Sequence, residues 1–203
     1  MKKTLLMLTL LIAPLAVCAQ QFAHFTSTDV LQAMPDYRKA YDEMNALRTQ
    51  YSSELQTMQQ EFQTKYEKFQ KEVNEQTPAA IRERRVAEME QLQERLEQTQ
   101  RDFSSQLEQQ EAQKLEPIMK KVQDAINMVA RAGNFVYVMD KSTALRNNVF
   151  INEALSVDVT SRIMDALSIT PEDIAAGKAF VARMQQEAQQ QQQQTAGQPA
   201  GTR

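Results

Sequence analysis

Few residues in this sequence have the type and spacing that catalysis or metal binding requires. Its 203 residues include one histidine, His24, and one cysteine, Cys18. There is no pair of metal ligands at helical spacing, no glycine-rich phosphate loop and no nucleophile motif, and the carboxylates are scattered along segments of helical pattern. An isolated histidine on a predicted strand is interpreted as a core or interface residue. We therefore predict no catalytic residue, no metal and no other cofactor, in a protein that is not an enzyme.

The first 19 residues have the pattern of an export signal. A pair of lysines is followed by the apolar run Leu5–Val17, which is too short to span a bilayer comfortably. Val17 and Ala19 would occupy the −3 and −1 positions of a signal-peptide cleavage site, where small or tolerated residues are required. Cleavage is therefore predicted after Ala19. The alternative is a lipoprotein signal with an acylated Cys18, although such signals prefer Gly, Ala or Ser where this chain has Val17.

The predicted mature chain is acidic and has no cysteine. Loss of residues 1–19 leaves 21 of the 23 basic residues against 26 acidic residues, a net side-chain charge of −5. Disulfides and thiol chemistry are then unavailable. With 4 glycines, no tryptophan and abundant Gln, Glu and Ala, the composition indicates a helix-rich chain. No second apolar segment is long enough to cross a membrane, so we expect a soluble periplasmic protein, and no nucleic-acid partner.

An apolar stripe that repeats every 11 residues indicates a long helix. The intervals between its members are 3, 4 and 4 residues and then repeat. This corresponds to about 3.67 residues per turn, close to that of a relaxed α-helix, so the stripe stays on one face. A helix with one such face requires a partner along its length. The members are Met44, Leu47, Tyr51, Leu55, Met58, Phe62, Tyr66, Phe69 and Val73.

A second apolar stripe with the same 11-residue repeat follows a predicted turn at residues 74–78. Pro78 pushes the preceding residue out of helical geometry and can begin a new helix, predicted to run from about residue 79 to 132. If the chain folds back here, so that paired residue numbers sum to about 154, the two stripes face each other in an antiparallel hairpin. The predicted seam of this arm consists of Leu47, Tyr51, Met58, Phe62, Tyr66, Val73, Ile81, Met89, Leu92, Leu96, Phe103 and Leu107.

Polar residues interrupt the apolar tracks of the return helix. They are Arg85, Gln100, Glu111 and Lys114. One interpretation is that these long side chains extend out of the seam to reach water. The other is that the arm is loosely packed and can bend, because weak packing lowers the free energy of local opening.

The segments on either side of the hairpin predict a small head. Strands are predicted at residues 21–26, 134–139 and 149–151, the second of them buried on both faces. Residues 140–148 are predicted to form a loop. Asp158 is predicted to cap a helix whose Val159, Ile163 and Leu167 share one face, and a further helix is predicted from Thr170 to about residue 186.

The predicted fold class is α+β, mostly α, with the helical hairpin inserted between the first and second strands of a small β-containing head. Only about 80 residues lie outside the two long predicted helices, which is few for an independent core. The predicted divisions are a signal peptide at 1–19, the first part of the head at 20–43, the arm at 44–113 with its tip near 74–79, the second part of the head at 114–167, and a C-terminal extension at 168–203 that is Gln-rich and disordered at its end.

The chain resembles the OmpH family, the Skp-like periplasmic chaperones, over roughly residues 21–167. The resemblance is carried by the exported N-terminus, the long hairpin and three motifs, which are DVLQAMPDYRKAYDEM, NFVYVMDKSTALRNN and VDVTSRIMDAL. It implies a homotrimer whose heads form a shared β-structured body with three projecting arms. It also implies that unfolded outer-membrane β-barrel proteins are held between the arms without ATP. Well-known family members are strongly basic, however, so attraction to anionic membranes is not carried over on net charge.

Trimerisation is also consistent with the number of strands. Three short strands in each chain are too few to be stable alone, and assembly would close their edges. The trimer core is predicted to include Phe22, Phe25, Phe135, Val136, Val138 and Phe150.

The arm tip is locally cationic. Six basic residues face four glutamates between residues 65 and 85, a local net charge of +2. This cluster is interpreted either as an ordinary charged helix surface or as a weak contact for acidic clients or membrane headgroups. The basic residues are Lys65, Lys68, Lys71, Arg82, Arg84 and Arg85.

The leading functional hypothesis is an ATP-independent periplasmic holdase for unfolded outer-membrane proteins. The alternative is a rigid coiled-coil scaffold or spacer of the cell envelope. A rigid spacer should have an unbroken seam and a terminal anchor, whereas this seam is interrupted and cleavage after Ala19 would remove Cys18. Both features favour the holdase.

Overall fold

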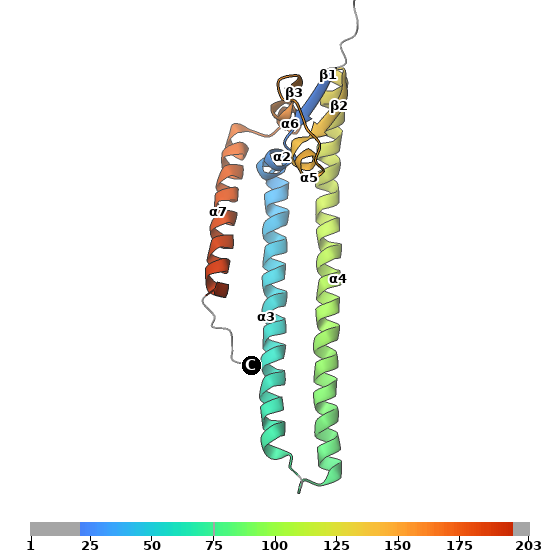
Figure 1. Cartoon of the computed structure of the whole chain (residues 1–203), viewed down its shortest axis with the longest axis vertical. Helices are drawn as coiled ribbons and strands as arrows, with labels where there is room; N and C mark the ends of the chain where they lie inside the picture. Colours follow the sequence, from blue (N-terminus) through green and yellow to red (C-terminus); the bar gives the residue numbers. More distant parts are fainter. Residues whose placement is uncertain (1–20, 75, 197–203) are drawn as a thin grey trace, which may run out of the picture. The chain divides into compact units, whose positions relative to one another are not determined.

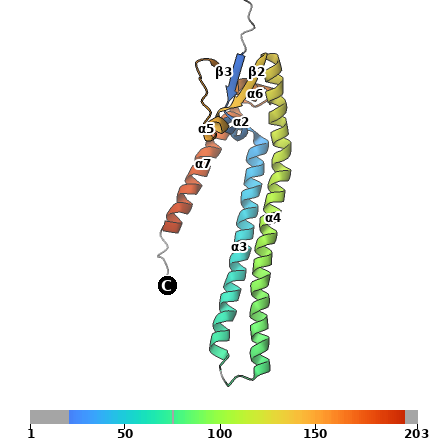
Figure 2. The same cartoon turned by 45° about the vertical axis from the view of Figure 1, so that its right-hand side comes forward.

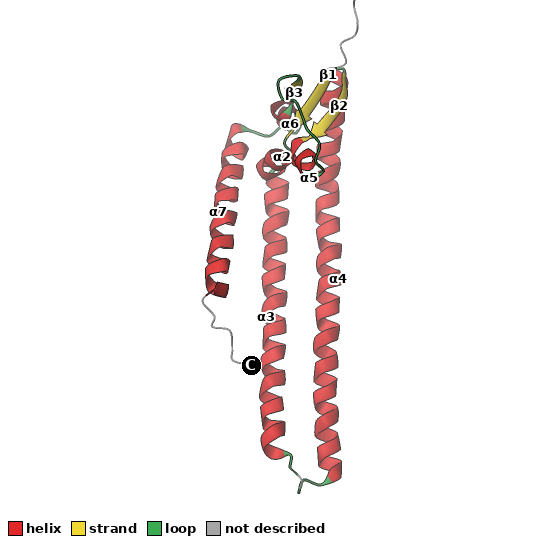
Figure 3. Cartoon of the chain, viewed as in Figure 1, coloured by secondary structure: helices red, strands yellow, loops and turns green. Residues whose placement is uncertain are grey.

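The computed structural model describes residues 21–74 and 76–196 of the chain (Figure 1). The predicted signal sequence, including Ala19 and Cys18, lies outside the described residues. Within the described ranges most of the chain is helical and the strands are short (Figure 3). The predicted class, α+β and mostly α, is therefore confirmed. The elements in chain order are β1 (Gln21–Phe25), α2 (Ser27–Ala33), α3 (Pro35–Glu72), α4 (Ala79–Ala132), β2 (Phe135–Asp140), α5 (Lys141–Arg146), β3 (Ser156–Asp158), α6 (Thr160–Ala166) and α7 (Pro171–Ala196).

The chain divides into two compact units. The arm unit is Met34–Lys120, and the head unit combines the described residues up to Ala33 with those from Lys121 onwards. The arm is thus inserted in the sequence between β1 and β2. It extends beyond the predicted range 44–113 at both ends.

The head contains a parallel sheet with the strand order β2-β1-β3. Strand β1 is central, and its Ala23 pairs with Val138 of β2 and with Val157 of β3. Ala23 and Phe25 are buried, at 1% and 5% exposure. Parallel neighbours require long connections, and here the arm itself supplies the connection from β1 to β2.

The third strand lies at Ser156–Asp158, and the prediction of a strand at residues 149–151 is wrong. Residues Val-Phe-Ile favour a strand locally, but the backbone before them turns. Asn148 adopts a left-handed φ of 56°, and the Val149 amide donates to the carbonyl oxygen of Ala144 at 2.9 Å. The chain therefore reaches the edge of β1 only several residues later.

The other two differences also concern residues near β2. The prediction that this strand is buried on both faces is wrong, because it is an edge strand that leaves Val136 and Tyr137 exposed at 47% and 62%. The predicted loop at 140–148 contains α5. Asp140 caps α5, since its Oδ1 accepts from the Ser142 amide at 3.1 Å.

Two helices follow β3 in the head. Helix α6 begins at Thr160, and Val159, not the predicted Asp158, occupies its N-cap position. Asp158 Oδ1 still accepts from the Thr160 amide at 2.9 Å, and Val159 and Ile163 are at 0% exposure. Helix α7, which was predicted to reach about residue 186, continues to Ala196. A reciprocal capping box begins α7. The Thr170 amide donates to Asp173 Oδ2 at 3.0 Å, and the Asp173 amide donates to Thr170 Oγ1 at 3.2 Å.

The arm is an antiparallel pair of long helices (Figure 2). Pro35 occupies the first turn of α3, where its missing amide hydrogen costs nothing. The turn to α4 includes residues 73–74 and 76–78, and in it the Asn74 amide donates to Thr77 Oγ1 at 2.9 Å. Helix α4 then continues through Pro117 to Ala132.

Candidate functional site

The seam of the arm is only half-buried. Between residues 45 and 117, none of the described residues is buried, and those of the arm unit that are buried lie at Met34, Ala40, Met44 and Ile118. Ten of the twelve predicted seam residues are half-buried, while Tyr66 and Ile81 are exposed at 41% and 42%. Two helices can cover only the facing side of each seam residue. Apolar surface is therefore accessible along most of the arm.

One contact directly reports the register of the hairpin. The rings of Tyr51 and Phe103 stack with their centroids 3.9 Å apart and their planes 8° apart. Their residue numbers sum to 154, so this is a contact that the predicted register requires. The Tyr51 hydroxyl also donates to Gln106 Oε1 at 2.6 Å. The other proposed pairs of the seam remain predictions.

Two of the four polar residues on the apolar tracks, Glu111 and Lys114, bind across the hairpin. Arg48 donates to Glu111 at 3.0 Å, and Lys114 forms an ion pair with Glu43. The hydrogen bond from Lys114 is the main cause of a lowered pKa for the Glu43 carboxyl. These side chains are partly exposed, so solvent screens both pairs and each contributes little to stability. Glu111 and Lys114 therefore link the two helices through partly exposed ion pairs and do not form a dry core.

Three of the six basic residues at the arm tip bind within the arm. Lys65 pairs with Glu61 and Arg85 with Glu88, each at 2.9 Å. Arg82 donates to the Asn74 carbonyl at 3.0 Å, which closes the turn. Lys68, Lys71 and Arg84 are the other three members of this cluster.

A groove of about 400 Å³ lies between the two helices near the tip. Lys65, Lys68 and Arg85 line it together with Glu72 and Glu88, and Phe69 and Met89 supply its apolar walls. Its mixed lining could accept short charged or amphipathic groups. Charge attraction at this place is weakened by the carboxylates that share the groove.

The six residues predicted for the trimer core are not equally accessible in one chain. Phe25 is buried at 5% exposure, and Phe135 and Val138 are half-buried. Phe22, Val136 and Phe150 are exposed at 44%, 47% and 88%. Half of the predicted set is therefore available for contacts outside the chain.

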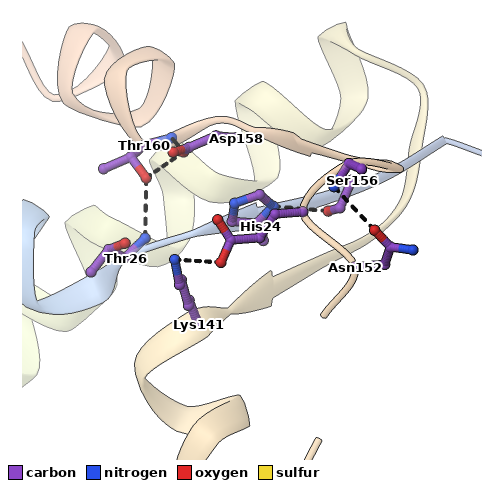
Figure 4. Close-up of polar contacts among 9 residues, drawn as sticks. His24, Thr26, Lys141, Asn152, Ser156, Asp158 and Thr160 are labelled. Atoms are coloured by element: carbon purple, nitrogen blue, oxygen red, sulfur yellow. Dashed lines mark hydrogen bonds and ion pairs between the residues drawn. The ribbon is translucent and has the colours of Figure 1, made fainter. Parts of the chain in front are cut away.

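His24 is a core residue of the head, as predicted, with 3% exposure. Its Nδ1 lies 2.9 Å from the Ser156 hydroxyl oxygen, which links β1 to β3 (Figure 4). The Thr26 amide donates to Thr160 Oγ1 at 3.1 Å, and Thr160 in turn donates to Asp158 Oδ1. Burial acts to raise the pKa of Asp158, but the hydrogen bonds from Thr160 outweigh it and lower the pKa.

Asp140 is a structural residue that the sequence reasoning missed. Its carboxylate accepts from the Ser27 amide at 3.1 Å, from the Ser27 hydroxyl at 2.9 Å and from the Ser142 amide at 3.1 Å. It thus ties the end of β2 to the start of α2, 113 residues away in the sequence. The local signal was Asp followed two and three residues later by Ser142 and Thr143, which is typical of a helix cap.

No group of three or more His, Cys, Asp or Glu within the described parts of the chain is arranged to hold a metal. None of the described helices combines the length and the apolar character that a membrane span requires. The small parallel sheet with an inserted two-helix arm instead defines a coiled-coil hairpin protein.

The chain belongs to the OmpH-like family of outer membrane proteins, whose family model matches residues 21–167. Proteins of this family are periplasmic chaperones that act on outer-membrane proteins and are not enzymes, and the match supports a role of this kind for the chain. A comparison with curated proteins finds no match. Helix α7 lies entirely beyond the residues that the family model covers.

Proposed function

We propose that the chain is an ATP-independent periplasmic holdase, which as a homotrimer encloses unfolded outer-membrane β-barrel proteins between its arms. The observation that carries this proposal is the arm, in which none of the described residues from 45 to 117 is buried. Apolar side chains are spread thinly along its length. Such a surface suits many weak contacts, which become effective when several arms surround one client.

The alternative function, a rigid spacer in the cell envelope, is supported less well. A spacer benefits from a dry seam that resists bending, whereas this seam is half-buried and held partly by exposed ion pairs. Weak packing lowers the free energy of local opening and suits an arm that adapts to its client.

The proposal assigns assembly to the head and holding to the arm. Export with cleavage after Ala19 would deliver the mature chain to the periplasm, and the arm tip would make weak contacts with acidic clients or a membrane surface. The head supports assembly through exposed apolar residues such as Phe22, Val136 and Phe150.

Val138→Asp should dissociate the trimer, because an unpaired charge in a shared apolar core costs several kcal/mol. Sedimentation equilibrium of the unsubstituted mature protein at micromolar concentration tests the assembly itself, and a monomer would refute it.

The holdase function is tested by titrating the mature protein against an unfolded outer-membrane barrel protein and measuring light scattering. We expect aggregation to be suppressed near a ratio of one trimer per client. Deletion of Met44–Leu107 with a short linker should abolish this suppression while leaving a folded, trimeric head. If the shortened protein suppresses aggregation equally well, the arms do not hold the client. If it aggregates by itself, the division into head and arm is wrong.

A further inference from the structure

A small cavity near the base of the arm differs from the charged groove near its tip. It lies between α3 and α4, has a volume of about 150 Å³, and belongs entirely to the arm unit. Most of its lining is apolar or aromatic. We call this cavity the basal pocket, and its lining residues are Tyr37, Ala40, Tyr41, Met44 and Arg48 of α3 with Glu111 and Leu115 of α4.

The basal pocket exists because the apolar stripe of α3 continues into a small residue. The spacing of the stripe places position 40 four residues before Met44 on the same helix face. This position holds alanine, so the space between it and Leu115 of α4 is only partly filled. Ala40 and Met44 are buried, at 7% and 4% exposure, and form an apolar floor.

The size and walls of the basal pocket fit one aromatic ring. An apolar cavity of about 150 Å³ inside a protein is large enough to bind benzene. Tyr37 and Tyr41 supply two rings to the walls. Aromatic rings pack favourably against one another in offset or edge-to-face arrangements, which an aliphatic occupant would not provide. The pocket therefore favours an aromatic side chain over an aliphatic one of similar size.

An ion pair lies on the solvent side of the basal pocket. Arg48 Nη2 donates to Glu111 Oε2 at 3.0 Å, and the two side chains are 44% and 47% exposed. Their charges cancel, so the pair does not favour a charged occupant. Arginine binds the face of an aromatic ring, and a carboxylate accepts from a phenol hydroxyl or an indole N–H. Burial, together with Tyr41 and Glu111, raises the pKa of the Tyr37 hydroxyl, which stays uncharged at neutral pH.

We infer that the basal pocket binds a single tyrosine or tryptophan side chain of an unfolded outer-membrane protein. This inference rests on the proposed holdase function and names the kind of side chain that the arm selects. Outer-membrane barrels carry girdles of aromatic residues at both membrane interfaces. A pocket for one side chain requires no fixed structure in the client. It therefore adds an aromatic anchor to the many weak contacts along the arm.

A small probe tests the pocket without a client. The chain has no tryptophan, so N-acetyl-tryptophanamide is the only source of indole fluorescence in the mixture. We expect its fluorescence anisotropy to rise saturably on titration with the mature protein, to one probe per chain. N-acetyl-tyrosinamide should displace the probe, whereas N-acetyl-leucinamide should displace it by about 2- to 10-fold less effectively, the difference that an aromatic pair makes.

Variants that alter the pocket locate this binding. Leu115→Phe places a ring of the chain itself in the pocket and should abolish saturable binding of the probe. The same change at Leu145 in the head, which is 71% exposed, is the matched control and should leave binding unchanged. Tyr41→Leu removes one wall and should weaken binding by about 2- to 10-fold. It serves in place of Leu115→Phe if that variant does not fold.

A client experiment separates failure of the pocket from failure of the holdase. We expect the Leu115→Phe protein to release a captured unfolded barrel protein faster than the unsubstituted protein, and the Leu145→Phe protein to release it at the unchanged rate. Three results would overturn the inference while leaving the holdase standing. These are no saturable probe binding, equal displacement by the leucine and tyrosine amides, and equal release by all three proteins. An unsubstituted protein that fails to suppress client aggregation would instead refute the proposed function, and with it the client as occupant of the pocket.

Discussion

At Gly177 of α7, an added Cβ atom would lie 2.7 Å from the backbone oxygen of Gln32 in α2. A backbone oxygen cannot swing aside as the end of a flexible side chain can, so the two helices would have to separate. Alanine is normally preferred over glycine in a helix by about 1 kcal/mol. Here the steric clash opposes that preference. The sign of the change in the free energy of unfolding on Gly177→Ala therefore shows whether α7 packs against α2 in solution.

We expect Gly177→Ala to destabilise the protein by about 1–3 kcal/mol, the usual cost of overpacking a close contact. The measurement is equilibrium denaturation at one fixed protein concentration, because assembly would make stability depend on concentration. Lys178→Ala, at an exposed neighbouring position, should change stability by less than about 0.5 kcal/mol. A stabilised Gly177→Ala protein would mean that α7 does not rest on α2.

Asp140 permits a test of the pH dependence of the head. Burial acts to raise the pKa of its carboxyl, but hydrogen bonds from Thr143, Ser27 and Ser142 outweigh this and hold the pKa below its usual value of 3.8. A pKa lowered in the folded state means that the charged form stabilises the fold. That stabilisation is present above about pH 3.8 and is lost as the pH falls through the lower, folded-state pKa.

At neutral pH, Asp140→Ala should therefore cost about 0.5–2 kcal/mol of the free energy of unfolding, as the loss of a helix cap does. The difference from the unsubstituted protein should shrink as the pH is lowered below about 3.8. Denaturant titrations at several pH values measure both effects. Asp124→Ala, at an exposed position on α4, is the matched control and should have little effect at neutral pH. A difference that is constant with pH would indicate that the lost packing of Asp140, and not its charge, matters.

At the scale of elements, sequence reasoning succeeded where the pattern was long and local. The stripe from Met44 to Val73 repeats often enough to define a helix face, and its mirror image in α4 defines the hairpin. It failed at β3 because strand pairing is decided by distant partners. Val149–Ile151 has the stronger strand propensity, yet Val157 is the residue that pairs with Ala23 of β1. The bond between Asp140 and Ser27 joins residues 113 positions apart and has no local signature at Ser27.

The half-buried seam predicts that the arm opens before the head does. Near the tip, the side chains that cover the helical hydrogen bonds are partly exposed. The sheet hydrogen bonds of β1 instead lie beside buried Ala23 and Phe25. Hydrogen exchange followed by mass spectrometry should show faster exchange in residues 55–74 and 76–100 than in β1 and α6. Phe103→Ala should accelerate exchange in α3 near Tyr51, since it removes the stacked ring. Uniform protection of arm and head would favour the rigid spacer over the holdase.

At the scale of the whole molecule, the proposed assembly and the proposed client holding would draw on different kinds of surface. The head concentrates its exposed apolar residues in a few places, including Phe150 and Tyr137, as a specific interface requires. The arm instead spreads half-buried residues along α3 and α4. A client that lacks fixed structure cannot match a specific pocket, so it is better held by many weak contacts from several arms at high effective concentration.

The six basic residues of the arm tip differ in whether they bind groups within the arm. Lys65, Arg82 and Arg85 bind groups within the arm, so reversing them should disturb the arm whether or not they attract a client. Lys68, Lys71 and Arg84 are therefore the better test. Changing these three residues to Glu should weaken client capture mainly at low salt, because exposed charges are screened over about 8 Å at physiological ionic strength.

Light scattering with an unfolded acidic client at several salt concentrations measures this effect. We expect the variant and the unsubstituted protein to converge as salt rises, because screening removes the attraction that distinguishes them. The matched control reverses Lys65, Arg82 and Arg85, and its loss of capture should persist at high salt if these residues mainly maintain the structure of the tip. Equal capture by the Lys68, Lys71 and Arg84 variant at low salt would show that the cationic tip is an ordinary charged surface. Client holding would then rest on the apolar side chains of the arms alone.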